Sequence, residues 1–174
     1  MTGAYITNGA RDRQSTERGG LVKPISVHFS SSKDDWATPP EFFKIYNNLF
    51  DFELDVCASE RNAKCASFYT LADDGLAQTW APRRCWMNPP YGRTIGQWMK
   101  KAYEESLKGA LVVCLVPSRT DTAWWHNYAV KGLVEFVRGR LKFGGHRNSA
   151  PFPSAVVIFR PPRILPMAHE TDKA

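Results

Sequence analysis

The sequence has no cysteine pairs of the metal-binding kind and no long apolar run. None of its four cysteines forms a Cys-x-x-Cys pair, and three lie in or beside strand-like apolar runs, where a reduced cysteine acts as a small hydrophobe. We therefore expect no zinc or other metal. No apolar run approaches the ~18 residues of a membrane span, and the N-terminus lacks a signal-peptide core, so we expect a cytoplasmic protein without a membrane partner. The cysteines are Cys57, Cys65, Cys85 and Cys114.

The composition is that of one folded domain with a basic surface. Hydrophobic residues make up 43% and aromatic residues 13% of the 174 residues, which excludes a wholly disordered chain. A chain of this length has room for one substantial core and hardly for two. The net charge of +6 favours a polyanionic partner such as nucleic acid. Many basic proteins bind no nucleic acid, so the charge alone leaves the partner open.

Charge and proline content divide the chain into three parts. Residues 1–31 are polar and contain more basic than acidic groups, which predicts a flexible basic arm that either contacts phosphates or is simply solvated. Residues 32–165 carry the periodic apolar patterns of a folded domain. Prolines at 161, 162 and 166 then break regular structure, so residues 166–174 are predicted to form a loose tail.

Strand-like and helix-like segments alternate through residues 32–165. This alternation predicts an α/β fold with a mostly parallel sheet and helices on both faces. The nearly continuous apolar run at 110–117 is typical of a central strand buried on both sides. Further strands are expected at 52–58, 65–70, 84–87, 133–137 and 154–159, and helices at 39–49, 94–108 and 121–130.

Two of the expected helices have capping signals. Thr38 as N-cap, Pro39 at the first helical position and Glu41 predict a capping box, and Thr94 with Gln97 predicts a second one. Apolar residues at helical spacing predict a buried stripe on the first of these helices. The stripe consists of Phe42, Ile45, Tyr46 and Leu49.

The most informative stretch is residues 84–92, in which a short apolar run ends at Asn88-Pro89-Pro90-Tyr91. Two consecutive prolines fix φ and remove two backbone donors, so a strand that reaches this point must leave the sheet in a rigid, extended turn. The turn holds Asn88 and Tyr91 in place. It also leaves the Pro89 carbonyl without a local donor that would compete for it.

Such a turn suits the activation of an amino group on a nucleobase. The amine is a poor nucleophile because its lone pair is delocalised into the ring. If the Asn88 side-chain oxygen and the Pro89 carbonyl each accept one amine hydrogen, the nitrogen is drawn toward tetrahedral geometry and its lone pair becomes available. Tyr91 can stack on the base and hold it near a methyl donor, which is catalysis by positioning. The predicted catalytic residues are Asn88, Pro89, Pro90 and Tyr91.

This motif resembles that of the amino-methyltransferases that use S-adenosylmethionine, and the wider chain resembles the small phage-type DNA adenine-N6 methyltransferases of the Dam group. The resemblance extends from about Trp36 to Phe159 and rests on an ordered set of motifs. It implies a single-domain Rossmann-like methyltransferase fold with residues 154–159 as an antiparallel strand at the sheet edge. The other matching stretches are residues 36–41, 54–59, 73–76, 115–118, 139–143 and 150–153.

The resemblance also implies where the donor, S-adenosylmethionine, binds. In the resembling enzymes the segment that corresponds to Trp36, Thr38 and Pro39 lines the pocket for the amino-acid end of the donor. Asp55 lies at the carboxyl edge of its expected strand, where open α/β sheets bind ligands. We therefore expect the Asp55 carboxylate to accept the donor's ammonium group.

Two further turns are assigned to the donor. Cys57 and Ala58 follow Asp55, but Ala58, Ser59 and Glu60 replace the glycine-rich turn that is usual at this point. A carboxylate in the Asp73-Asp74-Gly75 turn can accept the adenine amine or the ribose hydroxyls of the donor. We prefer Asp74 and keep Asp73 as the alternative, because adjacent side chains usually point in different directions.

Basic residues gather near the end of the domain. Residues 131–147 contain five Lys and Arg side chains against the single acid Glu135, and an aromatic and two glycines interrupt the run. A solvated surface is the ordinary interpretation of such a run. In the resembling enzymes an aromatic at this point packs on the target base opposite the tyrosine, and this role is carried to Phe143. The predicted DNA contacts are Arg140, Lys142 and Arg119.

Together these motifs predict the transfer of a methyl group from S-adenosylmethionine to adenine N6 in duplex DNA, with the adenine flipped out of the helix. A small recognition surface favours a short target sequence, or a homodimer that enlarges the surface. Cytosine N4, adenine in RNA and a glutamine amide stay open as substrates, because the motif suits any planar amine. The alternative from another class is a phage nucleic-acid-binding module that keeps the fold without catalysis.

Overall fold

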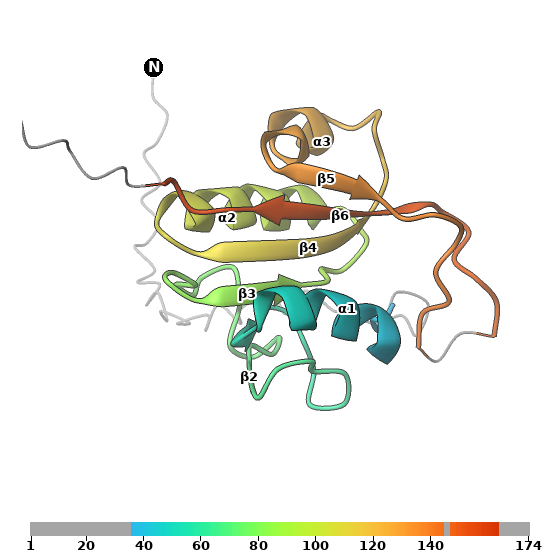
Figure 1. The fold of residues 1–174 in the computed structure, drawn as a ribbon, viewed down its shortest axis with the longest axis horizontal. Coiled ribbons are helices and arrows are strands. Elements are labelled where there is room, and N and C mark those ends of the chain that lie inside the picture. Colours follow the sequence, from blue (N-terminus) through green and yellow to red (C-terminus); the bar gives the residue numbers. More distant parts are fainter. Residues whose placement is uncertain (1–35, 145–146, 164–174) are drawn as a thin grey trace, which may run out of the picture. The chain divides into compact units, whose positions relative to one another are not determined.

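The computed structural model describes residues 36–144 and 147–163. In these residues one mixed sheet of six strands has the order β2-β1-β3-β4-β6-β5 (Figure 1). Strands β1 to β4 pair in parallel, whereas β6 is antiparallel to both β4 and β5. The predicted basic arm and C-terminal tail lie outside the described residues. The strands are β1 (Leu54–Asp55), β2 (Ser67–Phe68), β3 (Arg84–Met87), β4 (Leu111–Pro117), β5 (Leu133–Phe136) and β6 (Ser154–Phe159).

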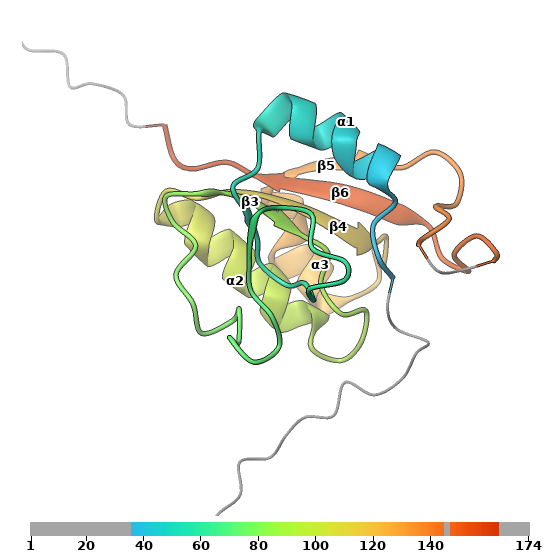
Figure 2. The ribbon, with the colours of Figure 1, turned by 90° about the horizontal axis from the view of Figure 1, so that it is seen from below.

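Helices cover both faces of the sheet. Helix α1 (Pro40–Phe50) lies on one face, and α2 (Ile95–Leu107) and α3 (Ala123–Asn127) lie on the other (Figure 2). The helix expected at 121–130 is interrupted, because α3 ends at Asn127 and a 3-10 turn, Ala129–Lys131, follows it. The predicted α/β class is confirmed. Within the described part of the chain, no helix is both long and apolar enough to cross a membrane.

Strand β4 is the centre of the structure. Six of its seven residues are buried, as its continuous apolar pattern predicts. Val112, Cys114 and Val116 pack into the core beneath α2, whereas Val113 and Leu115 pack into the core beneath α1. Because successive side chains of a strand point to opposite faces, this one segment joins the two cores.

The prediction that residues 154–159 form the edge strand is wrong. β6 is antiparallel as expected, but it lies between β4 and β5, so β5 is the edge strand. All six residues of β6 are buried, whereas Leu133 and Phe136 of β5 are 56% and 67% exposed. A strand that is apolar on both faces needs a neighbour on each side. Strand β5 contains the charged Glu135 and is mostly exposed, so it tolerates the edge position.

The predicted buried stripe of α1 is also partly wrong. Ile45 and Leu49 are 59% and 70% exposed. The helix is rotated so that Phe43 and Tyr46 pack against Trp86 of β3, with ring centroids 5.3 and 6.2 Å from the Trp86 ring. Burial of a large aromatic ring contributes more than burial of an aliphatic side chain, so the rings set the orientation of the helix.

Neither predicted capping box forms. Helix α1 begins at Pro40, one residue later than expected, and its N-cap is Pro39, which has no side-chain donor or acceptor. Thr94 does precede α2, but no side-chain hydrogen bond caps that helix, and the Gln97 N–H bonds to the Thr94 backbone carbonyl instead. Proline's fixed φ can start α1 without a side-chain cap.

A buried carboxylate fixes the long loop between β2 and β3 to helix α2. Glu105 of α2 accepts hydrogen bonds from the backbone N–H groups of Trp80 and Ala81 at 2.8 and 3.1 Å. Its other oxygen contacts the ammonium groups of Lys101 and Lys108, both at 2.9 Å. Burial alone would raise the pKa of this carboxyl, but these hydrogen bonds outweigh it and lower the pKa to about 2.

We predict that Glu105→Gln lowers the free energy of unfolding at pH 7 by on the order of 3 kcal/mol, because the lost charge leaves two lysines and two N–H groups without a carboxylate. Because the pKa of Glu105 is lower in the folded than in the unfolded protein, its carboxylate stabilises the fold fully above the unfolded pKa, near 4.5. This stabilisation is lost as the pH falls toward 2. Urea unfolding at pH 7 and pH 3 measures the effect. The matched control, Glu104→Gln, changes an exposed carboxylate that pairs with Lys100, and we expect a loss below about 1 kcal/mol. Equal losses for the two variants would contradict the anchoring role.

Candidate active site

The exits of β1 and β3 lie side by side at the carboxyl edge of the sheet. The two strands pair in parallel with Asp55 opposite Trp86, so Cys57 and Asn88 follow at equivalent positions. Burial raises the pKa of the Cys57 thiol, the nearby Asp55 carboxylate raises it further, and the backbone N–H of Asn88 bonded to the sulfur partly opposes the shift. The predicted donor carboxylate and the predicted catalytic amide thus meet at one edge.

One hydrogen bond fixes the orientation of the Asn88 amide. Its Nδ2 donates to the backbone carbonyl of Trp36 at 2.6 Å. Its Oδ1 is buried and has no hydrogen-bond partner among the residues that the structure describes. No described N–H group donates to the Pro89 carbonyl either. Leaving a buried acceptor unpaired costs about 1–3 kcal/mol, and at Oδ1 this acceptor is available to the donor of a ligand.

Asp55 is a buried carboxylate, only 3% exposed. The backbone N–H of Lys64 donates to one of its oxygens at 3.0 Å, and that of Cys57 to the other at 3.4 Å. Burial raises the pKa of Asp55 to about 6, and these two N–H groups only partly oppose the shift. A carboxylate has about four acceptor positions, so each oxygen can accept a further hydrogen from a bound cation.

The Asp73-Asp74-Gly75 turn packs against the exit of β1. A Cβ atom at Gly75 would collide with the backbone carbonyl oxygen of Val56, so only glycine allows this close approach. The indole N–H of Trp80 donates to the Gly75 carbonyl at 2.8 Å and holds the turn in place. Through Trp80, the Glu105 anchor therefore also supports this turn.

The two aspartates of this turn have different surroundings. Asp73 accepts the backbone N–H and the hydroxyl of Thr70 at 2.7 and 2.6 Å, and these bonds lower its pKa. Asp74 has a positive φ of 49°, and its side chain is exposed. No described group bonds to the Asp74 carboxylate, so it is the more available of the two for a ligand.

An aromatic cluster lies beside the amide. Phe143 is 1% exposed, and its ring meets those of Trp36 and Tyr91 edge to face, with centroids 5.4 and 6.0 Å apart. Phe152 packs against the same two rings, and the Tyr91 hydroxyl donates to the Leu115 carbonyl at 3.3 Å. Tyr91 and Phe143 are in direct contact, which leaves no room for a base between them in this conformation.

Phe152 is a site residue to which the sequence reasoning assigned no role. It lies between two prolines, Pro151 and Pro153, in one of the stretches that carry the family resemblance. Flanking prolines restrict the backbone and hold the ring in place, as they do in the Asn-Pro-Pro-Tyr turn. That repeated pattern of an aromatic beside prolines is the signal that could have identified it.

The three predicted basic contacts lie on the surface of the protein. Arg119, Arg140 and Lys142 are all exposed. Arg119 follows β4 and lines a hollow of about 450 Å³ together with Tyr91. Among the described residues, no group of three or more His, Cys, Asp or Glu side chains is arranged to hold a metal ion.

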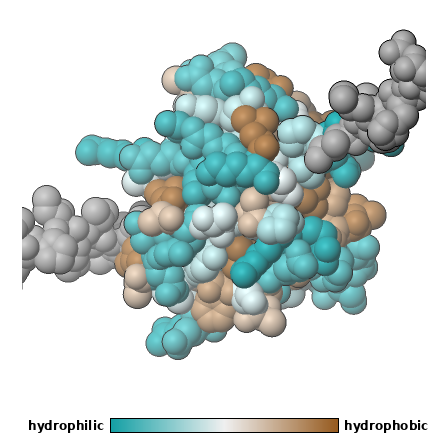
Figure 3. Space-filling view, turned by 90° about the vertical axis from the view of Figure 1, so that its left-hand side faces the viewer, coloured by the Kyte–Doolittle hydropathy of each residue, from teal (hydrophilic) through white to brown (hydrophobic). Residues whose placement is uncertain are grey.

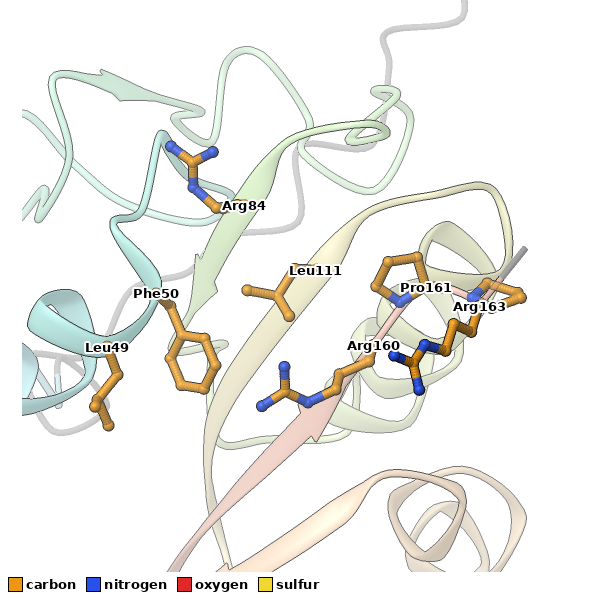
Figure 4. Close-up of a pocket in the computed structure, with 8 residues that line it drawn as sticks. Leu49, Phe50, Arg84, Leu111, Arg160, Pro161 and Arg163 are labelled. Carbon is orange, nitrogen blue, oxygen red and sulfur yellow. The ribbon is translucent and has the colours of Figure 1, made fainter. Parts of the chain in front are cut away.

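A larger hollow, of about 680 Å³, lies at the opposite end of the strands (Figure 4). It is lined where Arg84 begins β3, Leu111 begins β4 and Arg160 follows β6. Figure 3 shows this end of the domain, where hydrophilic residues cover most of the surface and apolar residues form small separate patches. Its position at the amino ends of the parallel strands separates it from Asn88, so it is not part of the candidate site.

Comparisons with known proteins identify the family of the chain. The sequence model of the family described as DNA N-6-adenine-methyltransferase (Dam) matches residues 26–169. The DNA N-6-adenine-methyltransferase of Haemophilus phage HP1 is 31% identical over 140 residues, which cover 75% of this chain and 81% of the phage protein. That of Escherichia phage T1 is 33% identical over 95 residues, 53% of this chain and 40% of the T1 protein. The chain therefore belongs to the Dam family of DNA N-6-adenine-methyltransferases.

Proposed function

We propose that the protein transfers the methyl group of S-adenosylmethionine to N6 of an adenine that is flipped out of duplex DNA. The observation that carries the proposal is the buried Oδ1 of Asn88 at the exit of β3, which, like the carbonyl of the following Pro89, has no hydrogen-bond partner among the described residues. The names of the phage relatives support adenine in DNA over cytosine, RNA or a protein amide. The basic residues around the site support a nucleic-acid substrate.

The two oxygens act on the adenine amine as a pair of fixed acceptors. Asn88 Oδ1 accepts one N6 hydrogen and the Pro89 carbonyl accepts the other, so the nitrogen lone pair moves out of conjugation with the ring. The lone pair attacks the methyl carbon, the carbon–sulfur bond breaks, and its electrons return to sulfur. The methylated nitrogen then releases one proton to solvent. Because these dipoles are in place before the reaction, no reorganisation is needed during it.

The donor-side residues suit a ligand that carries an ammonium group and a nucleoside. When bound, S-adenosylmethionine supplies an electrophilic methyl carbon on a sulfonium. In our proposal Asp55 accepts hydrogens from the donor's ammonium group and Asp74 accepts hydrogens from its adenosine. Cys57 and Ala58, which follow β1, also contact the donor. Trp36, Thr38 and Pro39 complete the pocket, and the Trp36 carbonyl also fixes the Asn88 amide. The donor segment thus touches the catalytic residue directly.

Binding of the target base requires Phe143 to move. Its ring contacts Tyr91, and the backbone N–H of Gly144 donates to the Ala37 carbonyl at 2.8 Å, which ties this loop to the donor segment. A flipped adenine inserted next to Tyr91 replaces the edge of Phe143, after which Phe143 can pack on the other face of the base. The exposed cations Arg140 and Lys142 lie on the same loop, so phosphate contacts and base binding are mechanically linked.

We predict that Asn88→Ala lowers methyl incorporation by at least ~100-fold, because it removes one of two preorganised acceptors. The measurement incubates unmethylated DNA with labelled donor and digests the product to nucleosides. For the wild type, the label is expected in N6-methyl-2′-deoxyadenosine. The matched control is Asn48→Ala, an exposed asparagine on α1, which should retain full activity. Equal incorporation by wild type and Asn88→Ala refutes the role of the amide, and label in N4-methylcytosine or in protein refutes the substrate.

We predict that donor affinity falls below pH 6. Asp55 is ionised above its pKa of about 6 and attracts the ammonium, but it becomes neutral as the pH falls, so affinity should drop about tenfold between pH 7 and pH 5. Calorimetry with S-adenosylmethionine over this range measures the effect. Asp55→Asn should bind weakly and without this pH dependence, whereas the exposed control Glu60→Gln should behave as the wild type. Absence of any heat of binding in the wild type would instead favour a catalytically silent module.

A further inference from the structure

A second hollow adjoins the Asn-Pro-Pro-Tyr turn on the side of helices α2 and α3. It has a volume of about 450 Å³ and lies where β4 ends at Pro117 and α2 begins. Tyr91 forms one wall, and Trp124 of α3 is also part of the lining. Because Tyr91 also belongs to the aromatic cluster beside Asn88, the hollow and the proposed base pocket share a wall. The lining of the hollow includes Tyr91, Arg93, Pro117, Arg119, Thr122 and Trp124.

The charge of the hollow is positive and uncompensated. Arg93 and Arg119 both line it and both are exposed, and neither forms an ion pair with a described residue. The adjacent first turn of α2 contains no acidic residue and has no side-chain cap, so the positive end of the helix dipole adds to the two guanidinium groups. Two guanidinium groups that line the same hollow and have no described ion-pair partner suit a phosphate, which arginine binds with paired hydrogen bonds.

The apolar wall of the hollow suits a base or a sugar. Trp124 is half-buried, and its ring meets that of the buried Trp125 edge to face, with centroids 5.5 Å apart. Gly96 of α2 packs against Trp124, where an added Cβ atom would lie 3.4 Å from the Cβ of the tryptophan. The indole is therefore supported from two sides and presents a fixed aromatic surface, on which a nucleobase stacks without preference for sequence.

We propose that this hollow binds the nucleotide next to the flipped adenine, with its phosphate between Arg93 and Arg119 and its base or sugar on Trp124. The Thr122 hydroxyl donates to the Arg119 backbone carbonyl at 2.7 Å, which holds the turn that carries Arg119. The inference rests on the proposed function, since it takes Tyr91 as the wall of the adenine pocket. A volume of this size matches one nucleotide and not a longer segment of DNA. The hollow then holds the strand on one side of the flipped base, while the loop that carries Arg140 and Lys142 holds it on the other.

The first arm of the test measures DNA affinity without donor, so it does not depend on methylation. Fluorescence anisotropy with a labelled duplex gives the dissociation constant over a range of salt concentrations for wild type, Arg93→Gln and Arg119→Gln. We expect each variant to bind roughly 5- to 10-fold more weakly, with the salt slope reduced by about 1. The matched control is Arg83→Gln, an exposed arginine at the amino end of β3, which changes the net charge equally and should leave both quantities unchanged. Equal effects of Arg83→Gln and Arg93→Gln would overturn the proposal.

The second arm locates the contact on a duplex that the wild type methylates. Neutral methylphosphonate linkages replace the phosphates around the target adenine one at a time. For wild type we expect a loss of affinity at one or two phosphates beside that adenine, and for the Arg93→Gln, Arg119→Gln double variant no further loss at those positions, because the partner is already missing. If the loss of affinity from each neutral linkage adds in full to the loss from the double variant at every position, the assignment of this phosphate to the hollow is wrong.

A third variant tests the aromatic wall. Trp124→Ala should weaken binding of the duplex about tenfold while its salt slope stays that of the wild type, since stacking involves no phosphate charge. Circular dichroism and urea unfolding establish that this variant is folded, and the two arginine variants test the site independently if it is not. A folded Trp124→Ala with unchanged affinity contradicts the stacking role. If the wild type methylates adenine normally and none of these variants changes DNA binding, this inference is wrong, whereas the proposed function is not contradicted.

Discussion

The hydrogen bond from Asn88 Nδ2 to the Trp36 carbonyl is the contact on which the site depends. An amide has one donor and one acceptor end, and a fixed acceptor for the donor end decides where the oxygen points. Here that contact leaves Oδ1 buried and unpaired, next to a proline carbonyl that no described N–H group uses. In the proposed function these two oxygens are the acceptor pair for an amino group, and this role needs no titrating side chain at the reacting atom.

The rest of the fold holds the partners of that contact in register. Parallel pairing of β1 with β3 places the Asp55 and Asn88 exits side by side, and β4 supports them from the next position in the sheet. Gly75 allows the donor turn to approach Val56, and Glu105 holds that turn from the far helix through Trp80. A buried charge on α2 thus positions a surface turn that is expected to contact the donor.

The proposed position of the target base is covered by an aromatic loop. Phe143 packs into the Trp36, Tyr91 and Phe152 rings, and the Gly144 N–H donates to the Ala37 carbonyl. The same loop contacts the segment proposed to line the donor pocket. In the proposed function, displacement of Phe143 by a base would act on residues next to the donor and so link the two binding events through direct contacts.

The sequence by itself determined the fold class, the central strand at 110–117 and the placing of Asn88 and Asp55 at strand exits, because strand period and proline chemistry are local properties. It could not determine the order of β5 and β6, the rotation of α1 or the absence of both capping boxes, since each results from competition between distant surfaces, such as the Trp86 ring that draws Phe43 and Tyr46 inward. Only the tertiary structure decided which Asn88 atom is free, that Phe143 is buried against Tyr91, and that Arg93 and Trp124 share a hollow. Such facts depend on side chains that meet across the fold, and no spacing along the chain records them.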